Sequence, residues 1–318
     1  MELMIVNREL TSFKRSDVPS ELLRGPCFFE ITKRALFDYS IVIASWFAMY
    51  HLPYYTYPIW VIIIAGRFHA FGVLIHELSH LNPIKKNWKF RTLEVMLGYP
   101  LGTTINAMAY HHLKHHRNTL MDNDPYFNIN KKCSPVGRLW LTFKKGPLFV
   151  PFWITRSLVG SLAFFIPSLR NFYVRTFLQE VSKEDLTNDE EVIRNLKEEF
   201  PLLFFHITLA YLATLFPFMI YAYYIVLPVA GTFCIYRLLI EHEYDVVDSR
   251  SVYTMIESTF DHHLSWYEKL ILGPHNIGYH CIHHIHPNAG LHHLPKIRNW
   301  YLQNCYKYGE AYGRTNEQ

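Results

Sequence analysis

The chain has 318 residues, of which 50% are hydrophobic and only 18% are charged. Soluble proteins carry about 25% charged residues, so the composition favours an integral membrane protein. The net charge is +4, and the basic residues lie in loops between apolar runs, which gives nucleic-acid binding little support. Five scattered cysteines form no C-x-x-C pair, so we expect reduced thiols rather than disulfides or a thiolate zinc site.

Four apolar stretches are long enough to cross a membrane. The first two cover about 35–51 and 57–75, and the uncharged aromatic turn LPYYTYP joins them. Tyrosines are enriched at membrane interfaces, so this pair predicts a transmembrane hairpin. The other two cover about 200–215 and 217–240 and predict a second hairpin. A further apolar run at 147–169 has Arg156 in its middle and prolines around it, so we interpret it as an interfacial helix.

The basic residues predict the orientation of the hairpins. The segment 77–146 is rich in lysine and arginine, and the positive-inside rule therefore places it in the cytoplasm. We expect the N-terminus, the C-terminus and any metal site on that side. The expected fold is an all-α integral membrane protein, a single domain over 1–318 with four transmembrane helices as two hairpins, interfacial helices and a cytosolic histidine-rich cap. The hairpins cover about 35–75 and 200–240, and the cap is built from 77–146 and 241–318.

Three histidine clusters stand out among the nineteen histidines: HELSH at 76–80, HHLKHH at 111–116 and HCIHHIH at 280–286. Residues at i, i+3 and i+4 share one face of an α-helix, so each H-x-x-H-H run presents its imidazoles together. All three clusters fall on the expected cytoplasmic side. Imidazole suits zinc, copper, iron and nickel, and these imidazoles exceed what one tetrahedral zinc ion uses. The pattern predicts two metals, or one metal of higher coordination number, without choosing the element.

From about residue 66 to 300 the chain resembles the membrane-bound fatty acid desaturase and hydroxylase superfamily. The resemblance rests on four motifs in order: GRFHAFGVLIHELSH, YHHLKHHRNTLMDNDPY, RLLIEHEYD and NIGYHCIHHIHP. It implies two iron ions in a non-haem di-iron centre at the cytosolic ends of the transmembrane helices. The iron ligands that it implies are His76, His80, His112, His115, His116, His280, His283 and His284, with His242 as a further ligand after the last span.

Three carboxylates lie close in sequence to these expected ligands. Glu77 and Glu241 each adjoin one, and Asp124 lies in the DNDP motif. Each could accept the free N–H of an imidazole and fix its tautomer. His111 and His286 lie next to expected ligands in the sequence, and we expect them to support the ligands from behind or to be incidental. The remaining histidines of the cytoplasmic side match no ligand position, and we expect them to be structural: His262, His263, His275, His292 and His293.

The resemblance implies an O₂-dependent oxidoreductase that oxidises an unactivated C–H bond of a lipid. We expect desaturation of the acyl chain of a lipid or fatty acid, and the alternative is a hydroxylase or ketolase of a lipid or carotenoid. The sequence carries no haem or flavin motif of its own, so the electrons come from an external donor of the cytochrome b5 or ferredoxin type.

Two other hypotheses explain fewer residues. An intramembrane zinc metalloprotease would use HELSH with Glu77 as its base, but it leaves both H-x-x-H-H runs without a role. A metal transporter would place ionisable groups along a path at mid-bilayer, whereas these histidines gather at one face.

Overall fold

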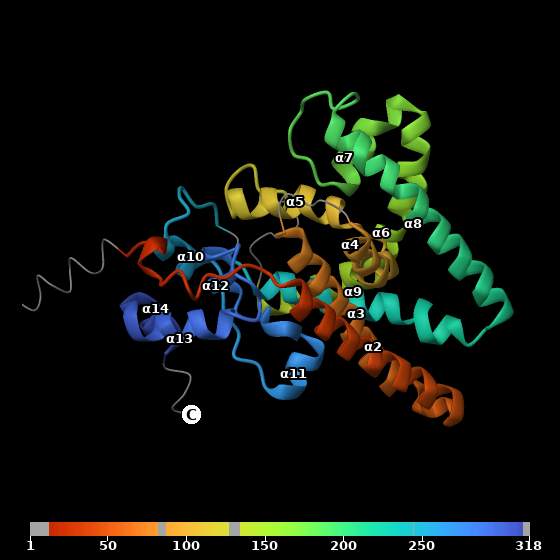
Figure 1. Ribbon diagram of the computed structural model, residues 1–318, viewed down its shortest axis with the longest axis horizontal. Coiled ribbons are helices and arrows are strands. Elements are labelled where there is room, and N and C mark those ends of the chain that lie inside the picture. The colour runs from red at the N-terminus through yellow and green to blue at the C-terminus, as the bar shows by residue number, and fades with distance from the viewer. Residues whose placement is uncertain (1–12, 82–86, 127–133, 244, 314–318) are drawn as a thin grey trace, which may run out of the picture.

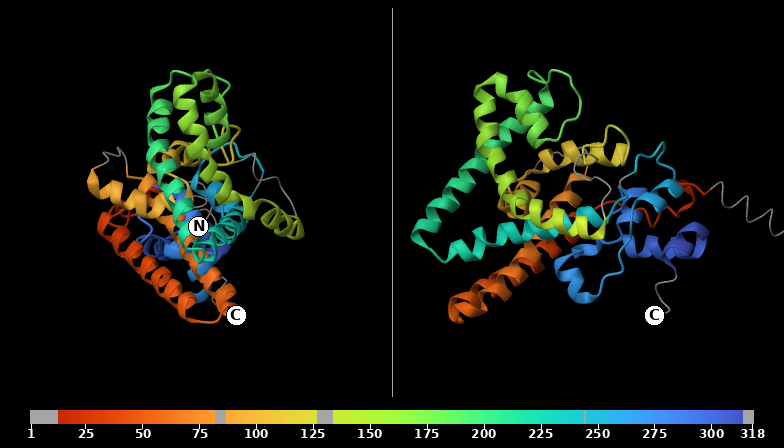
Figure 2. Two further views of the ribbon diagram at one scale, coloured as in Figure 1. Left: turned by 90° about the vertical axis from the view of Figure 1, so that its right-hand side faces the viewer. Right: turned by 180° about the vertical axis from the view of Figure 1, so that it is seen from behind.

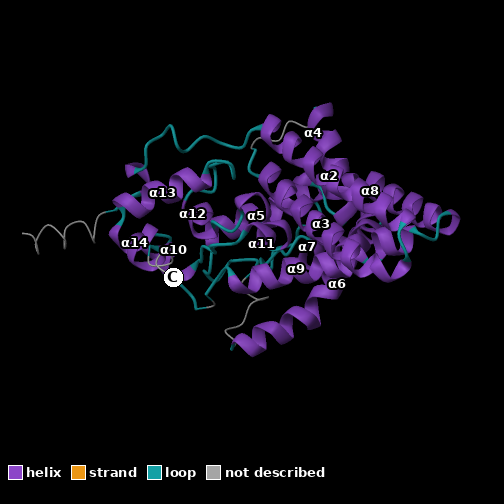
Figure 3. Cartoon of the chain, turned by 90° about the horizontal axis from the view of Figure 1, so that it is seen from below, coloured by secondary structure: helices purple, strands orange, loops and turns teal. Residues whose placement is uncertain are grey.

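The computed structural model describes residues 13–81, 87–126, 134–243 and 245–313. These residues form helices and loops, and no strand is drawn among them (Figure 1, Figure 3). The expected all-α class is confirmed for this part of the chain. Four lysines that support the expected orientation, and one cysteine, lie outside the described residues: Lys85, Lys86, Lys131, Lys132 and Cys133. The cysteines that are described are free thiols.

Six helices form the body of the protein: α2 (Phe28–His51), α3 (Tyr57–Ser79), α5 (Ile105–Asn118), α6 (Pro135–Phe165), α8 (Glu190–Leu215) and α9 (Val226–Ile240). The shorter helices are α4 (Trp88–Leu93), α7 (Arg170–Phe177), α10 (Val252–Ser258), α11 (Trp266–Ile271), α12 (His280–Ile285), α13 (Leu294–Asn304) and α14 (Tyr306–Tyr312). Two stretches are π-helical. One, η3 (Glu94–Gly98), follows α4, and the other, η7 (Ile220–Tyr224), precedes α9. Short 3-10 turns are η1 (Arg15–Asp17), η2 (Tyr54–Thr56), η4 (Tyr99–Leu101), η6 (Pro167–Leu169) and η8 (Pro274–Asn276).

Two helical hairpins project to one side of the molecule. Helices α2 and α3 form a packed one, and α8 and α9 form an open one, while α10, α12, α13 and α14 gather at the opposite end and α11 lies against α3 (Figure 1, Figure 2). Helix α3 is the central element, and nearly all of its second half is buried. A helix that is apolar all round is expected in such a buried position.

Three stretches are long and apolar enough to cross a membrane: Tyr54–Ser79, Pro135–Phe165 and Ile220–Ile240. Helices α2 and α8, which the sequence also predicts to cross, do not reach this level of hydropathy. Both carry charged side chains in their first halves, such as Asp38 and Glu199. Helix α6 does reach it, although the sequence predicts an interfacial helix there.

Small residues allow α6 and α9 to approach closely. A Cβ atom added at Gly231 would lie 2.3 Å from the carbonyl oxygen of Gly146, and one added at Gly146 would lie 2.5 Å from Cα of Thr232. Glycine at both positions therefore removes the side chains that would separate the two backbones.

A buried ion pair joins α6 to α8. Nε of Arg156 lies 3.0 Å from Oε1 of Glu199, and both side chains are fully buried. The hydroxyl of Tyr173 donates a hydrogen bond of 2.5 Å to the same carboxylate. The second half of α6 therefore lies beside the charged first half of α8.

The segment after α9 returns to the core through two isolated backbone bridges. His242 pairs with Thr259, and Asp261 pairs with Tyr279. Oδ1 of Asp261 also accepts a 2.7 Å hydrogen bond from the backbone N–H of Cys281, at the start of α12. These contacts bring His242 and the third histidine cluster to the same place.

Candidate metal centre

Four segments carry the expected ligands to one buried region. The first cluster ends α3, the second lies on α5, the third forms α12, and His242 lies two residues after the end of α9. All nine side chains are buried. Four segments far apart in the sequence thus present imidazoles to a shared centre, as the resemblance implies.

The imidazoles sort into two groups. In each, one nitrogen per residue lies within 4.8 Å of those of the other members. The first group contains His76, His80, His112, His116 and His283, and the second contains His115, His242 and His284. His280 adjoins the second group, because its Nε2 lies 3.2 Å from Nε2 of His242.

In each H-x-x-H-H run, the middle histidine lies with one group and the two outer histidines lie with the other. His112 and His116 face the first group, whereas His115 faces the second. In α12 the arrangement is reversed, because His283 faces the first group while His280 and His284 lie with the second. Residues four apart on a helix differ by about 40° in direction, whereas the residue three positions on points about 60° to the other side. Each run therefore serves both groups.

The ring nitrogens approach one another closely. Nε2 of His80 lies 3.1 Å from Nε2 of His112, and the Nε2 atoms of His76 and His283 are 3.2 Å apart. Both nitrogens of His116 are buried without a hydrogen-bond partner among the described residues. Converging, buried nitrogen lone pairs with so few donors fit a site for metal ions.

Burial favours the neutral form of most of these imidazoles. Burial, followed by the neighbouring imidazoles, holds the pKa values of several well below the usual value: His112, His116, His280, His283 and His284. Burial lowers the pKa of His80 to about 4, and burial together with the adjacent His115 lowers that of His242 to about 3. A metal ligand must be the neutral imidazole, so the protonation state matches the role.

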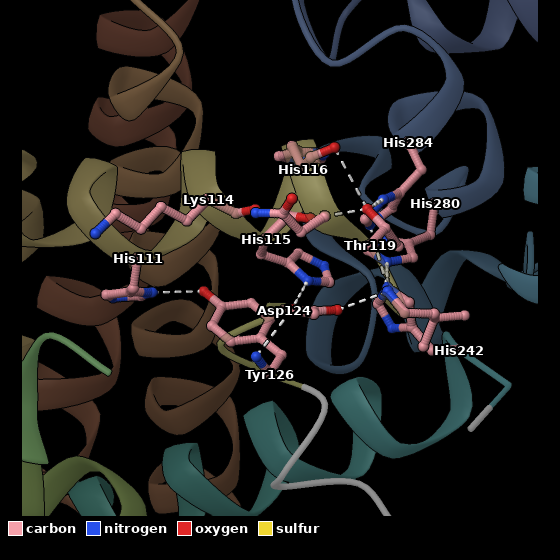
Figure 4. A network of polar contacts seen from close by, with 12 residues as sticks. His111, Lys114, His115, His116, Thr119, Asp124, Tyr126, His242, His280 and His284 are labelled. Atoms are coloured by element: carbon pink, nitrogen blue, oxygen red, sulfur yellow. Dashed lines mark hydrogen bonds and ion pairs between the residues drawn. The ribbon is translucent and has the colours of Figure 1, made fainter. Parts of the chain in front are cut away.

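Polar side chains fix the tautomers in the second group (Figure 4). Nδ1 of His115 donates to Oδ1 of Asp124 over 2.8 Å. The hydroxyl of Thr119 donates to the carbonyl of His115, so it accepts from Nδ1 of His284, 3.1 Å away. Both Nε2 atoms are thereby left as acceptors that face the group.

Asp124 is itself held in place. It accepts backbone hydrogen bonds from Leu120 (2.8 Å) and Tyr126 (2.9 Å). Burial raises the pKa of this carboxyl, but the contact with His115 and the two N–H groups outweigh it and lower the pKa overall. Leu120 has a φ of 59°, a strained value for a side chain of this size. The turn after α5 thus aims the carboxylate at His115.

The two glutamates differ from each other. Oε2 of Glu241 lies 3.5 Å from Nδ1 of His280, and its Oε1 pairs with Arg237 at 3.0 Å. Glu241 is therefore close to an imidazole, but neither its Oε2 nor that Nδ1 has a hydrogen-bond partner among the described residues. Glu77 faces a loop instead. Its Oε1 accepts a 2.9 Å hydrogen bond from the backbone N–H of Leu291, and among the described residues no histidine bonds to it. The side chain next to His76 on a helix points about 100° away, which turns Glu77 from the imidazoles toward that loop.

The other histidines lie outside both groups, within the part of the chain that the structure describes. His275 bonds to Asp38, His286 bonds to the hydroxyl of Tyr301, and His262 contacts the carbonyl of Ile240. His111 is closer to the centre, because its Nδ1 lies 2.7 Å from the hydroxyl of Tyr126 (Figure 4).

Sequence reasoning missed Thr119, Tyr126 and Arg237. The ring of Tyr126 stacks on His115 with centroids 4.3 Å apart. Arg237 precedes Glu241 by one helical turn, a spacing that predicts their ion pair. Nothing in the sequence links Thr119 to His284, because that contact depends on how α5 meets α12.

A cavity of about 130 Å³ adjoins both groups. Its walls include the histidines of all three clusters and apolar side chains from α3, α5, α6 and α9. An engineered apolar cavity of about 150 Å³ holds one benzene molecule. The cavity therefore accommodates a short piece of an apolar substrate next to the imidazoles.

The fold and the site define a helical protein with apolar helices and two histidine groups suited to metal ions. Residues 52–316 match the fatty acid desaturase family, and the chain belongs to it. No curated protein matches the chain. Family, histidine groups and apolar helices together identify a membrane-associated, metal-binding oxidoreductase of the desaturase type.

Proposed function

We propose that this protein is a di-iron enzyme that uses O₂ to desaturate the acyl chain of a lipid or fatty acid. The observation that carries the proposal is the sorting of nine buried imidazoles into two adjoining groups. Single tetrahedral zinc sites use four ligands at most. Two groups beside one cavity fit a pair of metal ions that act on one substrate.

Each group would hold one iron ion. His76, His80, His112, His116 and His283 would bind the first ion, and His115, His242, His280 and His284 the second. Bound iron supplies the one-electron and O₂ chemistry that no side chain can provide. Asp124 and Thr119 would orient the imidazoles of the second group, and Glu241 would do so for His280.

The overall reaction balances with an external reductant. One O₂, two electrons and two protons combine with the two hydrogens removed from adjacent carbons, and the products are a carbon–carbon double bond and two waters. The electrons would come from a partner of the cytochrome b5 or ferredoxin type. The cavity walls would keep the reacting carbons next to the metals and exclude water.

In the proposed topology α2, α3, α8 and η7–α9 cross the membrane as two hairpins. Helices α2 and α8 support this, because both expose large apolar side chains such as Phe47 and Phe204. The second half of α6 lies beside the charged part of α8 through Arg156 and Glu199, which supports an interfacial position for it. The metal site and both termini would face the cytoplasm, in one domain whose cap comes from 77–146 and 241–318.

Expression in a host of known lipid composition tests the reaction, with mass spectrometry of total lipids and pigments. The proposal predicts a lipid that has lost two hydrogens. The variant His112→Ala is the control, and it should leave the lipids unchanged. A lipid or pigment that has gained oxygen would indicate the alternative, a hydroxylase or ketolase, instead of a desaturase. Unchanged lipids in the presence of iron and an electron donor would contradict the proposed activity.

A further inference from the structure

The cavity beside the histidine groups contains polar atoms that the metal centre does not use. His69, Gln179 and Arg237 line it together with apolar side chains. Three of their atoms are shielded from solvent and have no hydrogen-bond partner among the described residues: Nε2 of His69, Oε1 of Gln179 and Nε of Arg237. Buried polar groups are nearly always hydrogen-bonded, so three orphans around one cavity point to a ligand.

The chemical character of two of these atoms follows from their other contacts. Nδ1 of His69 lies 2.7 Å from the carbonyl oxygen of Ile271, so it carries the proton and donates. Nε2 of the neutral ring is then an acceptor. Arg237 contacts Glu241 through Nη1, and its Nε–H remains a donor. The cavity therefore offers both an acceptor and a donor.

Gln179 contributes through an unusual backbone. It lies between α7 and α8 with a φ of 53°, in the left-handed region that side chains other than glycine and asparagine seldom adopt. Strained residues cluster at ligand-binding sites, where the surroundings hold them. Its neighbour Glu180 is fixed by the hydroxyl of Tyr110 at 2.6 Å, which anchors the strained turn to α5.

The position of His69 relates these atoms to the metals. His69 precedes His76 by seven residues on α3, so both lie on one face, about 10 Å apart along the helix axis. Both line the same cavity. A polar group of the substrate that binds to His69 is thus separated from the imidazoles by only a few carbons of the substrate chain.

We infer that the substrate is a long-chain lipid with a hydroxyl or amide group near the carbons that are oxidised, bound through His69, Gln179 and Arg237. The inference rests on the proposed function for the reaction, but not for binding. A hydroxyl or an amide both donates and accepts, so it supplies the donor that His69 lacks and the acceptor that Arg237 lacks. A plain hydrocarbon segment would leave these buried atoms unpaired, which costs more than the hydrogen bonds themselves contribute.

Binding of two matched probes tests the inference. One is a long-chain N-acyl amino alcohol, and the other is the same molecule methylated on its amide nitrogen and hydroxyl oxygen. Titration of the iron-loaded, full-length protein in micelles is followed by tryptophan fluorescence, since Trp153 lines the cavity. We expect the unmethylated probe to bind about tenfold more tightly.

Variants separate the cavity from the rest of the protein. His69→Leu and Gln179→Leu should each remove most of the preference while the protein keeps its iron. His206→Leu, a histidine of α8 outside this cavity, should leave the preference unchanged. Equal affinity for both probes in the unmodified protein, or a preference that survives in both cavity variants, would overturn the inference.

The binding test and the test of the proposed function can fail independently. A tight, selective probe that is never oxidised in the presence of iron, O₂ and a reductant supports this binding site and contradicts the proposed activity. Oxidation of the methylated probe with equal affinity supports the activity and rejects this binding site.

Discussion

Oδ1 of Asp124 lies 2.8 Å from Nδ1 of His115, and the same carboxylate accepts two backbone N–H groups from the turn that follows α5. The turn thereby fixes both the tautomer and the direction of one imidazole in the second group. Metal affinity should depend on a side chain that is not itself a ligand.

Asp124→Asn should lower the affinity for iron about 10-fold to 100-fold, because the neutral amide no longer stabilises the oriented imidazole. Iron retained during dialysis against a graded series of chelator concentrations measures this. Asp122→Asn, an exposed aspartate two residues earlier, is the control. Equal iron retention by both variants would show that Asp124 has no part in the site.

Glu77 provides a test against the protease hypothesis. Glu77→Gln keeps an oxygen that can accept from the backbone of Leu291, so we expect iron content and lipid oxidation to be largely retained. Glu77→Ala should lower stability by about 1–3 kcal/mol, because a buried backbone N–H loses its partner. Lipid mass spectrometry and thermal unfolding in micelles measure the two effects. Complete inactivation of a well-folded Glu77→Gln protein would instead indicate a general base.

The ion pair between Arg156 and Glu199 should be costly to break from one side. Arg156→Met leaves a buried carboxylate without its partner, and we expect a loss of about 3–5 kcal/mol. The double variant Arg156→Met with Glu199→Gln should recover part of it. Lys307→Ala, which removes an ion pair to the exposed Glu257, should cost about 1 kcal/mol at most. Denaturant unfolding in micelles compares them, and equal losses in both single variants would be the contrary result.

Glu180 predicts a dependence of stability on pH. Partial burial raises the pKa of its carboxyl, but hydrogen bonds from Lys114, Tyr110 and the backbone of Ser182 outweigh this and lower the pKa to about 2, from 4.5. A depressed carboxyl pKa stabilises the folded state above pH 4.5, and this contribution is lost as the pH falls from 4.5 toward 2. The unfolding temperature of Glu180→Gln should therefore lie below that of the unmodified protein at pH 7, with a gap that narrows by pH 3. Glu184→Gln, an exposed control, should show no such narrowing.

The sequence contains enough to predict that the histidines converge. Helical spacing places His112, His115 and His116 on one side of α5, and the same spacing applies to α12. It does not contain the division into groups, because that depends on the angle at which α5 and α12 meet. His115 and His116 point about 100° apart on α5, and this difference places them in different groups.

Hydropathy along the chain does not register contacts between residues that are far apart in the sequence. Asp38 and Arg67 form a buried ion pair at 2.8 Å, so one of the charges that lower the hydropathy of α2 does not face the surroundings. Helix α6 has the composition of a span, yet Gly146, Gly160 and Arg156 bind it to neighbouring helices. Such compensation between distant residues is invisible to a window that slides along the chain. The same holds for Glu77, whose partner Leu291 is 214 positions away.

Iron stoichiometry of the purified protein, measured together with lipid oxidation, tests the two-metal centre most directly. The unmodified protein should contain about two irons per chain. His80→Ala, in the first group, and His242→Ala, in the second, should each lower that content toward one and abolish oxidation, whereas His206→Leu should keep both. A single zinc ion per chain, with activity retained when iron is absent, would contradict the di-iron proposal.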